Sequence, residues 1–421
     1  MKLSRAFFFS FVQIFFIPIF AFSQSGLPAG TWQAQAERAD GHHIMFTLKT
    51  GNRNGKPVAW LVNAKEKILI SDIRFTGDSV LFYLPFFEAE FRTVFHANNL
   101  KGVYRKRLED DYQVMPFSAT LKNANRFNGV PMKKGIDISG RYKVVFGERK
   151  AGDSTYSVGE FLQRENHVTG TFLNTDGDYR YLEGIISGDT LKLSCFDGGH
   201  AYLFTAIIKS NHELTNGKRY SGPEFSENWF AVRNTSIRLP DEFSLTHLKP
   251  GEHRLQFRFR STDGKEISLS DERFRNKVVI IQIMGSWCPN CMDETQFLAP
   301  FYQANKSKGV EIVGLAYERS TDFERSVKSL RSFQDRFHIE YPILITGVTV
   351  NDPKRTEKTL PQLQEIIAFP TTIFIGRDGK VAKIHSGFSG PGTGAHYEAE
   401  KRTIAETVKE LLGSPAGNIT Q

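Results

Sequence analysis

The amino-acid sequence predicts a multi-domain protein in which two related all-β units, each a barrel or a sandwich, precede one α/β domain. The chain has 421 residues, which is too long for one ordinary domain. Residues 24–240 consist of short strand-like runs separated by turn residues, with almost no helical periodicity. After residue 251, strand-like and helix-like segments alternate, which is typical of a sheet covered by helices.

The first residues are typical of an export signal. Lys2 and Arg5 precede a mostly apolar stretch, and Ala21-Phe22-Ser23 forms a small-x-small cleavage pattern. We therefore expect residues 1–23 to be a signal peptide and the mature protein to reside in the periplasm or cell envelope. An uncleaved membrane anchor is the alternative, although Pro18 interrupts the stretch. No later apolar run is long enough to span a bilayer, so we expect no stable membrane span after signal removal.

An internal repeat divides the β region into two units. Three short segments recur in the same order, at offsets of 110, 111 and about 115 residues: Gly30-Thr31-Trp32 with Gly140-Arg141-Tyr142, Thr76-Gly77-Asp78-Ser79-Val80 with Ser187-Gly188-Asp189-Thr190-Leu191, and more loosely Leu100-Lys101-Gly102-Val103-Tyr104 with Asn216-Gly217-Lys218-Arg219-Tyr220. The Gly-Asp pairs predict hairpin turns. We therefore predict one unit over residues 24–130 and a second over residues 131–240.

The β units contain no recognisable catalytic constellation. His42 and His43 are adjacent in a predicted strand, so their side chains point to opposite faces and predict no metal site. The aromatic segment 82–87 is more typical of a core or a domain interface than of a ligand site. Cys195 lies on the apolar face of a predicted strand, which indicates a buried and inert thiol.

Charge and cysteine content narrow the classes of function. The formal net charge is +8, but Lys and Arg mostly alternate with Asp and Glu. A nucleic-acid-binding surface would cluster its positive charge, so we expect no nucleic-acid partner. The chain has only three cysteines, so disulfides are not the general stabiliser of an exported protein of this size. The closely spaced pair Cys288 and Cys291 therefore stands out as functional.

Residues 241–250 are predicted to form a linker, and residues 251–421 the α/β domain. In chain order, the predicted segments are strands 255–259, 266–269 and 277–284, a helix from 288 to about 307, strand 311–316, helix 322–337, strands 342–345, 371–375 and 381–385, and helix 397–412. Asp263-Gly264 predicts a hairpin between the first two strands. This order predicts an α/β sheet covered on both faces.

The motif Trp287-Cys288-Pro289-Asn290-Cys291 joins a buried strand to a helix. A cysteine at the start of a helix lies beside unpaired backbone N–H groups and the positive end of the helix dipole, which favours its thiolate. We therefore predict that Cys288 is the attacking thiol, with a lowered pKa and greater exposure, and that Cys291 resolves the mixed disulfide one turn later. Pro289 fits the first helical position, because its missing N–H has no partner to lose there.

Two other interpretations of the motif remain open. A purely structural disulfide would not require the strand, the tryptophan and the helix around it. A zinc site would need further ligands, and the chain offers only Cys195 and no His pair at finger spacing after Cys291. We therefore expect redox chemistry at this motif and no bound metal or cofactor.

The α/β region resembles the thioredoxin-like thiol-disulfide oxidoreductases of the TlpA/ResA type. The matching segments are Lys277-Val278-Val279-Ile280-Ile281-Gln282-Ile283, the cysteine motif, Phe369-Pro370-Thr371-Thr372-Ile373-Phe374-Ile375 and Asp378-Gly379-Lys380. With the double β region in front, the chain is similar to the Bacteroidetes version of this family. The resemblance implies a thioredoxin fold over residues 251–421. It also implies that Pro370 is cis and lies against the cysteines, where Trp287, Phe369 and Pro370 dock an extended substrate.

Two positions bear on proton transfer in the resemblance. Six residues before Cys288, where thioredoxin has a buried Asp, this chain has Gln282, which cannot titrate. Glu294 resembles a carboxylate position near the cysteine pair of ResA-like proteins and is a candidate proton acceptor for Cys291. A solvated helix glutamate is the alternative for Glu294.

The sequence thus predicts an exported thiol-disulfide oxidoreductase that reduces or isomerises protein disulfides through a Cys288–Cys291 dithiol/disulfide cycle. Its expected partners are protein disulfide substrates and an upstream thiol reductant. One alternative is a binding protein whose β units carry the main activity. Another is a thiol peroxidase, but Ile281 and Gly285 stand where that class places Pro and Thr before its cysteine.

Overall fold

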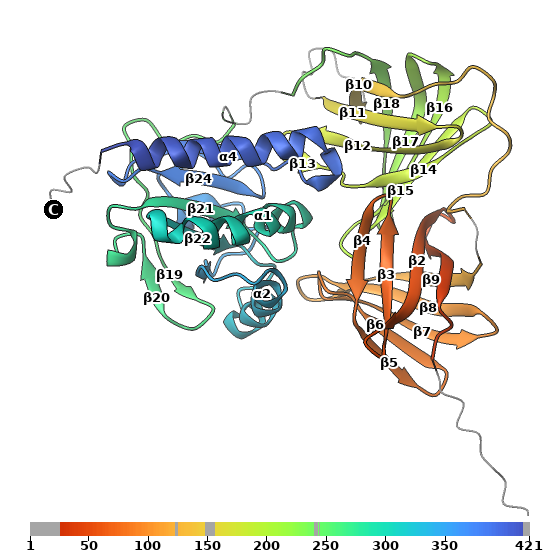
Figure 1. Ribbon diagram of the computed structural model, residues 1–421, viewed down its shortest axis with the longest axis horizontal. Helices are drawn as coiled ribbons and strands as arrows, with labels where there is room; N and C mark the ends of the chain where they lie inside the picture. Colours follow the sequence, from red (N-terminus) through yellow and green to blue (C-terminus); the bar gives the residue numbers. More distant parts are fainter. Residues whose placement is uncertain (1–25, 123–124, 148–155, 240–242, 244, 416–421) are drawn as a thin grey trace, which may run out of the picture.

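The computed structural model describes residues 26–122, 125–147, 156–239, 243 and 245–415. Figure 1 shows two all-β units stacked on one side of the molecule and the α/β domain on the other. The predicted fold class is therefore confirmed. The predicted signal peptide, residues 1–23, lies outside the described residues. Among the described residues, no helix is long and apolar enough to cross a membrane.

The first β unit is one nine-stranded antiparallel sheet in the order β4-β3-β2-β1-β9-β8-β7-β6-β5. Its edge strands β4 and β5 are separated in the chain by Ser71 alone, so the sheet curls into a nearly closed barrel. Trp32, Ala34 and Ala36 alternate inward along β1 and are fully buried. The strands are β1 (Gly30–Glu37), β2 (His43–Arg53), β3 (Lys56–Asn63), β4 (Glu66–Ile70), β5 (Asp72–Thr76), β6 (Ser79–Tyr83), β7 (Ala89–His96), β8 (Asn99–Arg107) and β9 (Tyr112–Leu121).

The second β unit is also a nine-stranded antiparallel sheet, and a pairing between β11 and β12 closes it into a barrel. Cys195 is fully buried in its β15, as the alternation predicted. The strands are β10 (Gly140–Phe146), β11 (Ser157–Arg164), β12 (His167–Asn174), β13 (Gly177–Asp178), β14 (Leu182–Ser187), β15 (Thr190–Phe196), β16 (Ala201–Ser210), β17 (Glu213–Ser221) and β18 (Phe225–Arg233).

The internal repeat of the sequence has structural counterparts. Gly30 and Gly140 each begin the first strand of their unit, and the aromatic residues two positions later, Trp32 and Tyr142, are both fully buried. The first Gly-Asp pair forms the turn between β5 and β6, and the second forms the turn between β14 and β15. The third, looser match falls in β8 and β17. The two barrels therefore carry equivalent residues at equivalent points.

The α/β domain is a seven-stranded mixed sheet in the order β20-β19-β23-β22-β21-β24-β25. Its strands are β19 (Arg258–Ser261), β20 (Glu266–Ser268), β21 (Val278–Met284), β22 (Val310–Ala316), β23 (Ile343–Ile345), β24 (Thr371–Ile375) and β25 (Val381–Ser386). Its helices are α1 (Pro289–Asn305), α2 (Phe323–Phe337), α3 (Arg355–Thr359) and α4 (Ala395–Gly413), with single 3-10 turns η2 (Glu272–Phe274), η3 (Lys306–Lys308) and η4 (Pro391–Thr393).

Central strand β21 is buried along its whole length, which explains its continuous apolar run. Val278 and Ile280 pack against α1 and α4 on one face, whereas Val279 and Ile281 face the segment around Leu363 on the other. The sheet is thus covered on both faces, as predicted. The first predicted strand was placed too early: Leu255 and Phe257 are buried outside any strand, and β19 spans Arg258–Ser261. The alternation of Leu255 and Phe257 reflects packing on the sheet face and not pairing within the sheet.

The aromatic segment 82–87 combines a core role and an interface role, as its composition predicted. Phe82 is fully buried within the first barrel. Phe86 stacks on Phe337 of α2, with ring centroids 5.9 Å apart and an interplanar angle of 11°. Figure 1 shows loops of the first β unit directed toward α2. The first barrel therefore contacts the α/β domain through aromatic side chains.

Candidate active site

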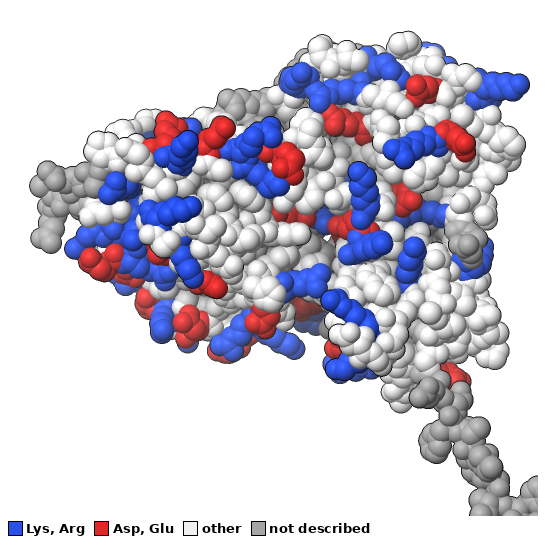
Figure 2. Space-filling view, viewed as in Figure 1, with Lys and Arg blue, Asp and Glu red and all other residues white. Residues whose placement is uncertain are grey.

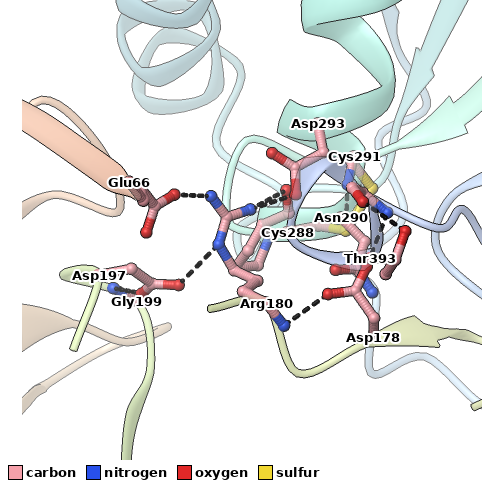
Figure 3. Close-up of polar contacts among 12 residues, drawn as sticks. Glu66, Asp178, Arg180, Asp197, Gly199, Cys288, Asn290, Cys291, Asp293 and Thr393 are labelled. Carbon is pink, nitrogen blue, oxygen red and sulfur yellow. Dashed lines mark hydrogen bonds and ion pairs between the residues drawn. A yellow bond between two sulfur atoms is a disulfide. The ribbon is translucent and has the colours of Figure 1, made fainter. Parts of the chain in front are cut away.

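The two motif cysteines lie where β21 passes into α1 and form a disulfide (Figure 3). Cys288 is the N-cap residue of α1, and its Sγ accepts a hydrogen bond from the Cys291 backbone N–H at 3.1 Å. Pro289 occupies the first helical turn, as predicted. The helix start therefore directs a backbone donor at the Cys288 sulfur, the arrangement that stabilises a thiolate after reduction.

Both cysteines are buried in the oxidised chain. Cys288 is 3% exposed and Cys291 is fully buried, so the predicted difference in exposure is present but very small. A segment of the second β unit around β13 lies on the two residues between the cysteines, Pro289 and Asn290. Asn290 donates a hydrogen bond to the Asp176 carbonyl oxygen at 3.4 Å, and a Cβ on Gly177 would overlap the Asn290 side chain. The sequence around the cysteine motif does not predict this contact, because Asp176 lies 114 positions before Asn290.

The three predicted docking residues lie together beside Cys288. The Phe369–Pro370 peptide bond is cis, as the resemblance implied. The Cys288 Sγ lies 3.4 Å from the Phe369 carbonyl oxygen. The Trp287 ring lies 5.4 Å from the Phe369 ring, and its Nε1 donates to the Tyr317 carbonyl oxygen at 2.7 Å. Trp287, Phe369 and Pro370 therefore lie together next to the sulfur, with Trp287 and Phe369 half-buried and Pro370 buried.

Glu294 is fully buried, which rules out the alternative of a solvated helix glutamate. Its carboxylate accepts hydrogen bonds from Gln282 Nε2 at 2.8 Å and from the Thr372 hydroxyl. Gln282 also lies 3.4 Å from the Cys291 carbonyl oxygen, so the amide connects the carboxylate to the motif backbone. Burial raises the pKa of Glu294 to about 7, although the bonds from Thr372 and Gln282 oppose the shift. A buried carboxyl that titrates near neutral pH can exchange protons during thiol chemistry.

Arg180 of the second β unit is a site residue that the sequence analysis missed. Figure 3 shows its guanidinium directed at the first turns of α1. Its Nη1 donates to Asp293 Oδ2 at 2.5 Å and to the Pro289 carbonyl oxygen at 3.3 Å. It also pairs with Glu66 of the first β unit and lies 3.3 Å from Asp197 of its own unit. One side chain thus joins both β units to the cysteine-bearing helix.

The contact between Arg180 and α1 has an unusual backbone conformation and an unusual concentration of buried charge. Arg180 adopts a left-handed conformation with φ of 56°, which an arginine retains only where its surroundings hold it. Burial raises the pKa of Asp293 to about 7, with Coulombic attraction to Arg180 acting in the opposite direction. Burial also raises the pKa of Asp178, which accepts hydrogen bonds from the backbone N–H of Arg180 and of Gly390. Acidic groups therefore outnumber the guanidinium that they surround.

Comparison with known proteins identifies the α/β part of the chain. Residues 249–401 match the family model described as Redoxin. This region is a Redoxin domain. The chain is 27% identical over 140 residues to thiol-disulfide oxidoreductase ResA of Bacillus subtilis, a match that covers 33% of this chain and 69% of the relative. It is 28% identical over 167 residues to ResA of Halalkalibacterium halodurans, covering 39% of this chain and 78% of the relative.

Solved structures resemble the chain over a similar share. A thiol:disulfide interchange protein of the thioredoxin family from Chlorobium tepidum has 20% sequence identity and a TM-score of 0.30, covering 38% of this chain and 96% of that one. A thiol-disulfide oxidoreductase from Bacteroides fragilis has 17% identity and a TM-score of 0.29, covering 37% and 99%. The Redoxin match and the ResA relatives confirm the predicted resemblance of this region to the thioredoxin-like thiol-disulfide oxidoreductases.

Proposed function

We propose that the protein is an exported thiol-disulfide oxidoreductase that reduces or isomerises disulfides of other proteins through Cys288 and Cys291. The observation that carries the proposal is the position of the Cys288 sulfur. It caps α1, accepts the Cys291 N–H at 3.1 Å and lies 3.4 Å from the Phe369 carbonyl oxygen beside cis-Pro370. A sulfur at a helix start, next to the half-buried Phe369 that precedes a cis proline, suits attack on a cysteine in an extended polypeptide.

The reaction begins with the reduced pair. The Cys288 thiolate attacks one sulfur of the substrate disulfide, so that a Cys288–substrate disulfide forms and the other substrate sulfur leaves as a thiolate. The Cys291 thiol then loses its proton and attacks the Cys288 Sγ, which breaks the mixed disulfide and releases the second substrate thiolate. The substrate disulfide has gained two electrons, and Cys288–Cys291 is oxidised. A thiol reductant returns the pair to the starting state.

Glu294 is the residue that we assign to the second step. Its carboxyl is fully buried, its pKa is raised to about 7 by burial, and Gln282 connects it to the Cys291 backbone. A group with this pKa can accept the Cys291 proton at neutral pH and return a proton to the departing thiolate. Gln282 supplies hydrogen bonds but no proton of its own, so Glu294 takes the place of the buried Asp of thioredoxin.

Trp287, Phe369 and Pro370 are proposed to dock the substrate polypeptide. Trp287 and Phe369 contact one another next to the Cys288 sulfur, and the buried Pro370 follows Phe369 directly. The backbone before Pro370 can pair with an extended segment, which gives affinity without a fixed side-chain sequence. Export rests on the N-terminal pattern of Lys2, Arg5, an apolar stretch and Ala21-Phe22-Ser23. The assignment to the periplasm or cell envelope follows from that pattern.

Reduction of insulin disulfides by the protein lacking residues 1–23, with dithiothreitol as the electron source, tests the proposal. We expect turnover well above the rate with dithiothreitol alone. Replacement of Cys288 by Ser should abolish this increment, whereas Cys195→Ser should retain it, because the Cys195 thiol is fully buried in the second barrel. No turnover above background by the folded protein, or unchanged turnover after Cys288→Ser, would contradict the proposed function.

A further inference from the structure

A cleft of about 700 Å³ lies between the first β unit and the Redoxin domain. Its volume falls within the range of about 300–1,000 Å³ that binding sites usually have. The loop between β6 and β7 and the end of β8 form one wall, and α2 forms the other. Ser286, Trp287 and Arg319 line it from the ends of β21 and β22. The cleft therefore belongs to the assembled protein and not to the Redoxin domain alone.

The cleft reaches the redox site at Trp287. This residue precedes Cys288, and its ring packs on Phe369, whose carbonyl oxygen lies 3.4 Å from the Cys288 Sγ. A polypeptide held in the cleft therefore borders the docking surface proposed above. Tyr83 and Tyr112 add half-buried aromatic surface from the first β unit. Aromatic side chains provide large contact area for a polypeptide at low entropic cost.

Direct contacts fix the two walls of the cleft relative to one another. Arg325 of α2 donates hydrogen bonds to the carbonyl oxygens of Leu108, at 2.7 Å, and Glu109. The Ser329 hydroxyl of α2 donates to the Glu88 carboxylate, and Phe86 stacks on Phe337. The cleft is thus bordered by interacting side chains from both sides, which favours a preformed site.

The cleft is rich in positive charge. Its lining includes eight Lys and Arg side chains against four Asp and Glu side chains. Arg74 pairs with Asp72, and Arg92 and Arg105 share Glu90. Among the residues that the structure describes, no carboxylate forms an ion pair with three other cations of the lining: Arg107, Arg319 and Lys328. Figure 2 shows Lys and Arg side chains on both sides of the junction between the β units and the Redoxin domain.

We propose that this cleft selects substrate proteins whose disulfide is flanked by acidic residues. Asp and Glu side chains of the substrate would pair with Arg107, Arg319 and Lys328, while Trp287 directs the adjacent cysteine toward Cys288. The inference rests on the proposed oxidoreductase function and adds a class of substrate to it. Charge complementarity of this kind acts mainly on the association rate and on discrimination between partners.

Charge reversal at the cleft tests the proposal. The test variant is Arg107→Glu/Lys328→Glu. The matched control is Lys354→Glu/Arg402→Glu, which changes the net charge equally at two residues outside the cleft lining. An Arg107→Gln/Lys328→Gln variant removes the two charges without reversing them. It keeps the test informative if the Arg107→Glu/Lys328→Glu variant does not fold. The substrates are two disulfide peptides of equal length, one with Asp and Glu beside its cysteines and one with Lys.

The measured quantity is the ratio of kcat/KM for the acidic peptide to that for the basic peptide. We expect the ratio to favour the acidic peptide, to fall roughly tenfold in the Glu variant and less in the Gln variant, and to stay unchanged in the control. It should also fall as salt is added. A ratio near one in the unmodified protein, or equal losses in test variant and control, would overturn the proposal.

A binding measurement separates the cleft from the chemistry. Labelled acidic and basic peptides without cysteine are titrated onto a Cys288→Ser/Cys291→Ser protein and its cleft variant. Tighter binding of the acidic peptide, weakened by Arg107→Glu/Lys328→Glu, supports the cleft even where no turnover is found. Equal binding of both peptides overturns it. Binding of inorganic polyphosphate as tight as that of the acidic peptide also overturns it, because the cleft would then serve another anion. Failure of the unmodified protein to reduce a neutral small disulfide counts against the proposed function alone.

Discussion

Asp293 and Glu294 are neighbours in α1, and they face different parts of the molecule. Both are buried, and burial raises the pKa of each to about 7. Glu294 contacts Gln282 of β21 and Thr372 of β24, which belong to its own domain. Asp293 contacts Arg180, which the second β unit supplies. Of these two adjacent carboxyls, Glu294 thus connects α1 to the sheet of its own domain, and Asp293 connects α1 to the second β unit.

The difference separates what the Redoxin domain brings to its cysteines from what the rest of the chain adds. The contacts of Glu294 come from strands β21 and β24 of the same sheet, so the Redoxin domain can form them without the β units. The Asp293 side exists only when Arg180 is present, and Arg180 in turn holds Glu66 of the first barrel. The β units are therefore part of the environment of the redox pair, as the cover over Asn290 also indicates.

Removal of the Arg180 charge should have the largest effect on the structure. Arg180→Met leaves the buried Asp293 and the half-buried Glu66 without their cation, whereas Asp197 keeps its contact with His200. Loss of one partner of a buried pair costs about 3–5 kcal/mol. We expect a lower urea midpoint and faster hydrogen exchange in the first turns of α1. A second change, Asp293→Asn, removes one of the unpaired charges and should restore part of the loss. Equal midpoints for the unmodified and Arg180→Met proteins would show that the junction does not hold the domains.

Replacement of Glu294 by Gln tests the inner carboxyl. If Glu294 moves the Cys291 proton, disulfide exchange should fall by about 100-fold or more. As a proton acceptor the carboxyl must be ionised, so the unmodified protein should gain activity as pH rises through about 7. The variant should lack this rise. An Asp293→Asn protein should keep it, and a variant with the unmodified pH profile would remove Glu294 from the mechanism.

The same variant makes a prediction about stability. Because the folded-state pKa of Glu294 is raised from 4.5 to about 7, the protonated form stabilises the fold below pH 4.5, and this contribution is lost as pH rises through 7. The loss amounts to roughly 3 kcal/mol. Relative to the unmodified protein, Glu294→Gln should therefore gain stability between pH 5 and pH 8. Denaturant unfolding at the two pH values measures the difference. A constant difference would mean that Glu294 is ionised throughout.

Separation of the domains should have the smallest effect on the chemistry itself. A protein limited to residues 251–421 retains the cysteines, Glu294 and Pro370. We expect it to reduce a neutral small disulfide within a few-fold of the full chain, while it loses the selectivity between acidic and basic peptides. Circular dichroism should first establish that the fragment is folded. Complete loss of exchange by a folded fragment would show that the β units complete the catalytic site.

The sequence predicted the features that depend on neighbouring residues, and it missed those that depend on distant ones. The cysteine motif and its helix start follow from local patterns, and cis-Pro370 was implied by the family resemblance; the structure has all three. The link between Arg180 and Asp293 joins residues 113 positions apart, and no periodicity marks either of them. The contact of Asn290 with Asp176 was missed for the same reason, because Asp176 belongs to another domain.

The most direct test of the central claim is to trap the mixed disulfide. With Cys291→Ser, the thiol that releases the substrate is gone, so substrate proteins should remain covalently attached to Cys288. Envelope extracts of cells that carry this variant, separated without reductant, should show adducts that dithiothreitol removes. Mass spectrometry should place every adduct at Cys288 and none at the buried Cys195. No adduct in cells where the unmodified protein cycles between oxidised and reduced forms, or adducts that persist in a Cys288→Ser/Cys291→Ser control, would contradict the account.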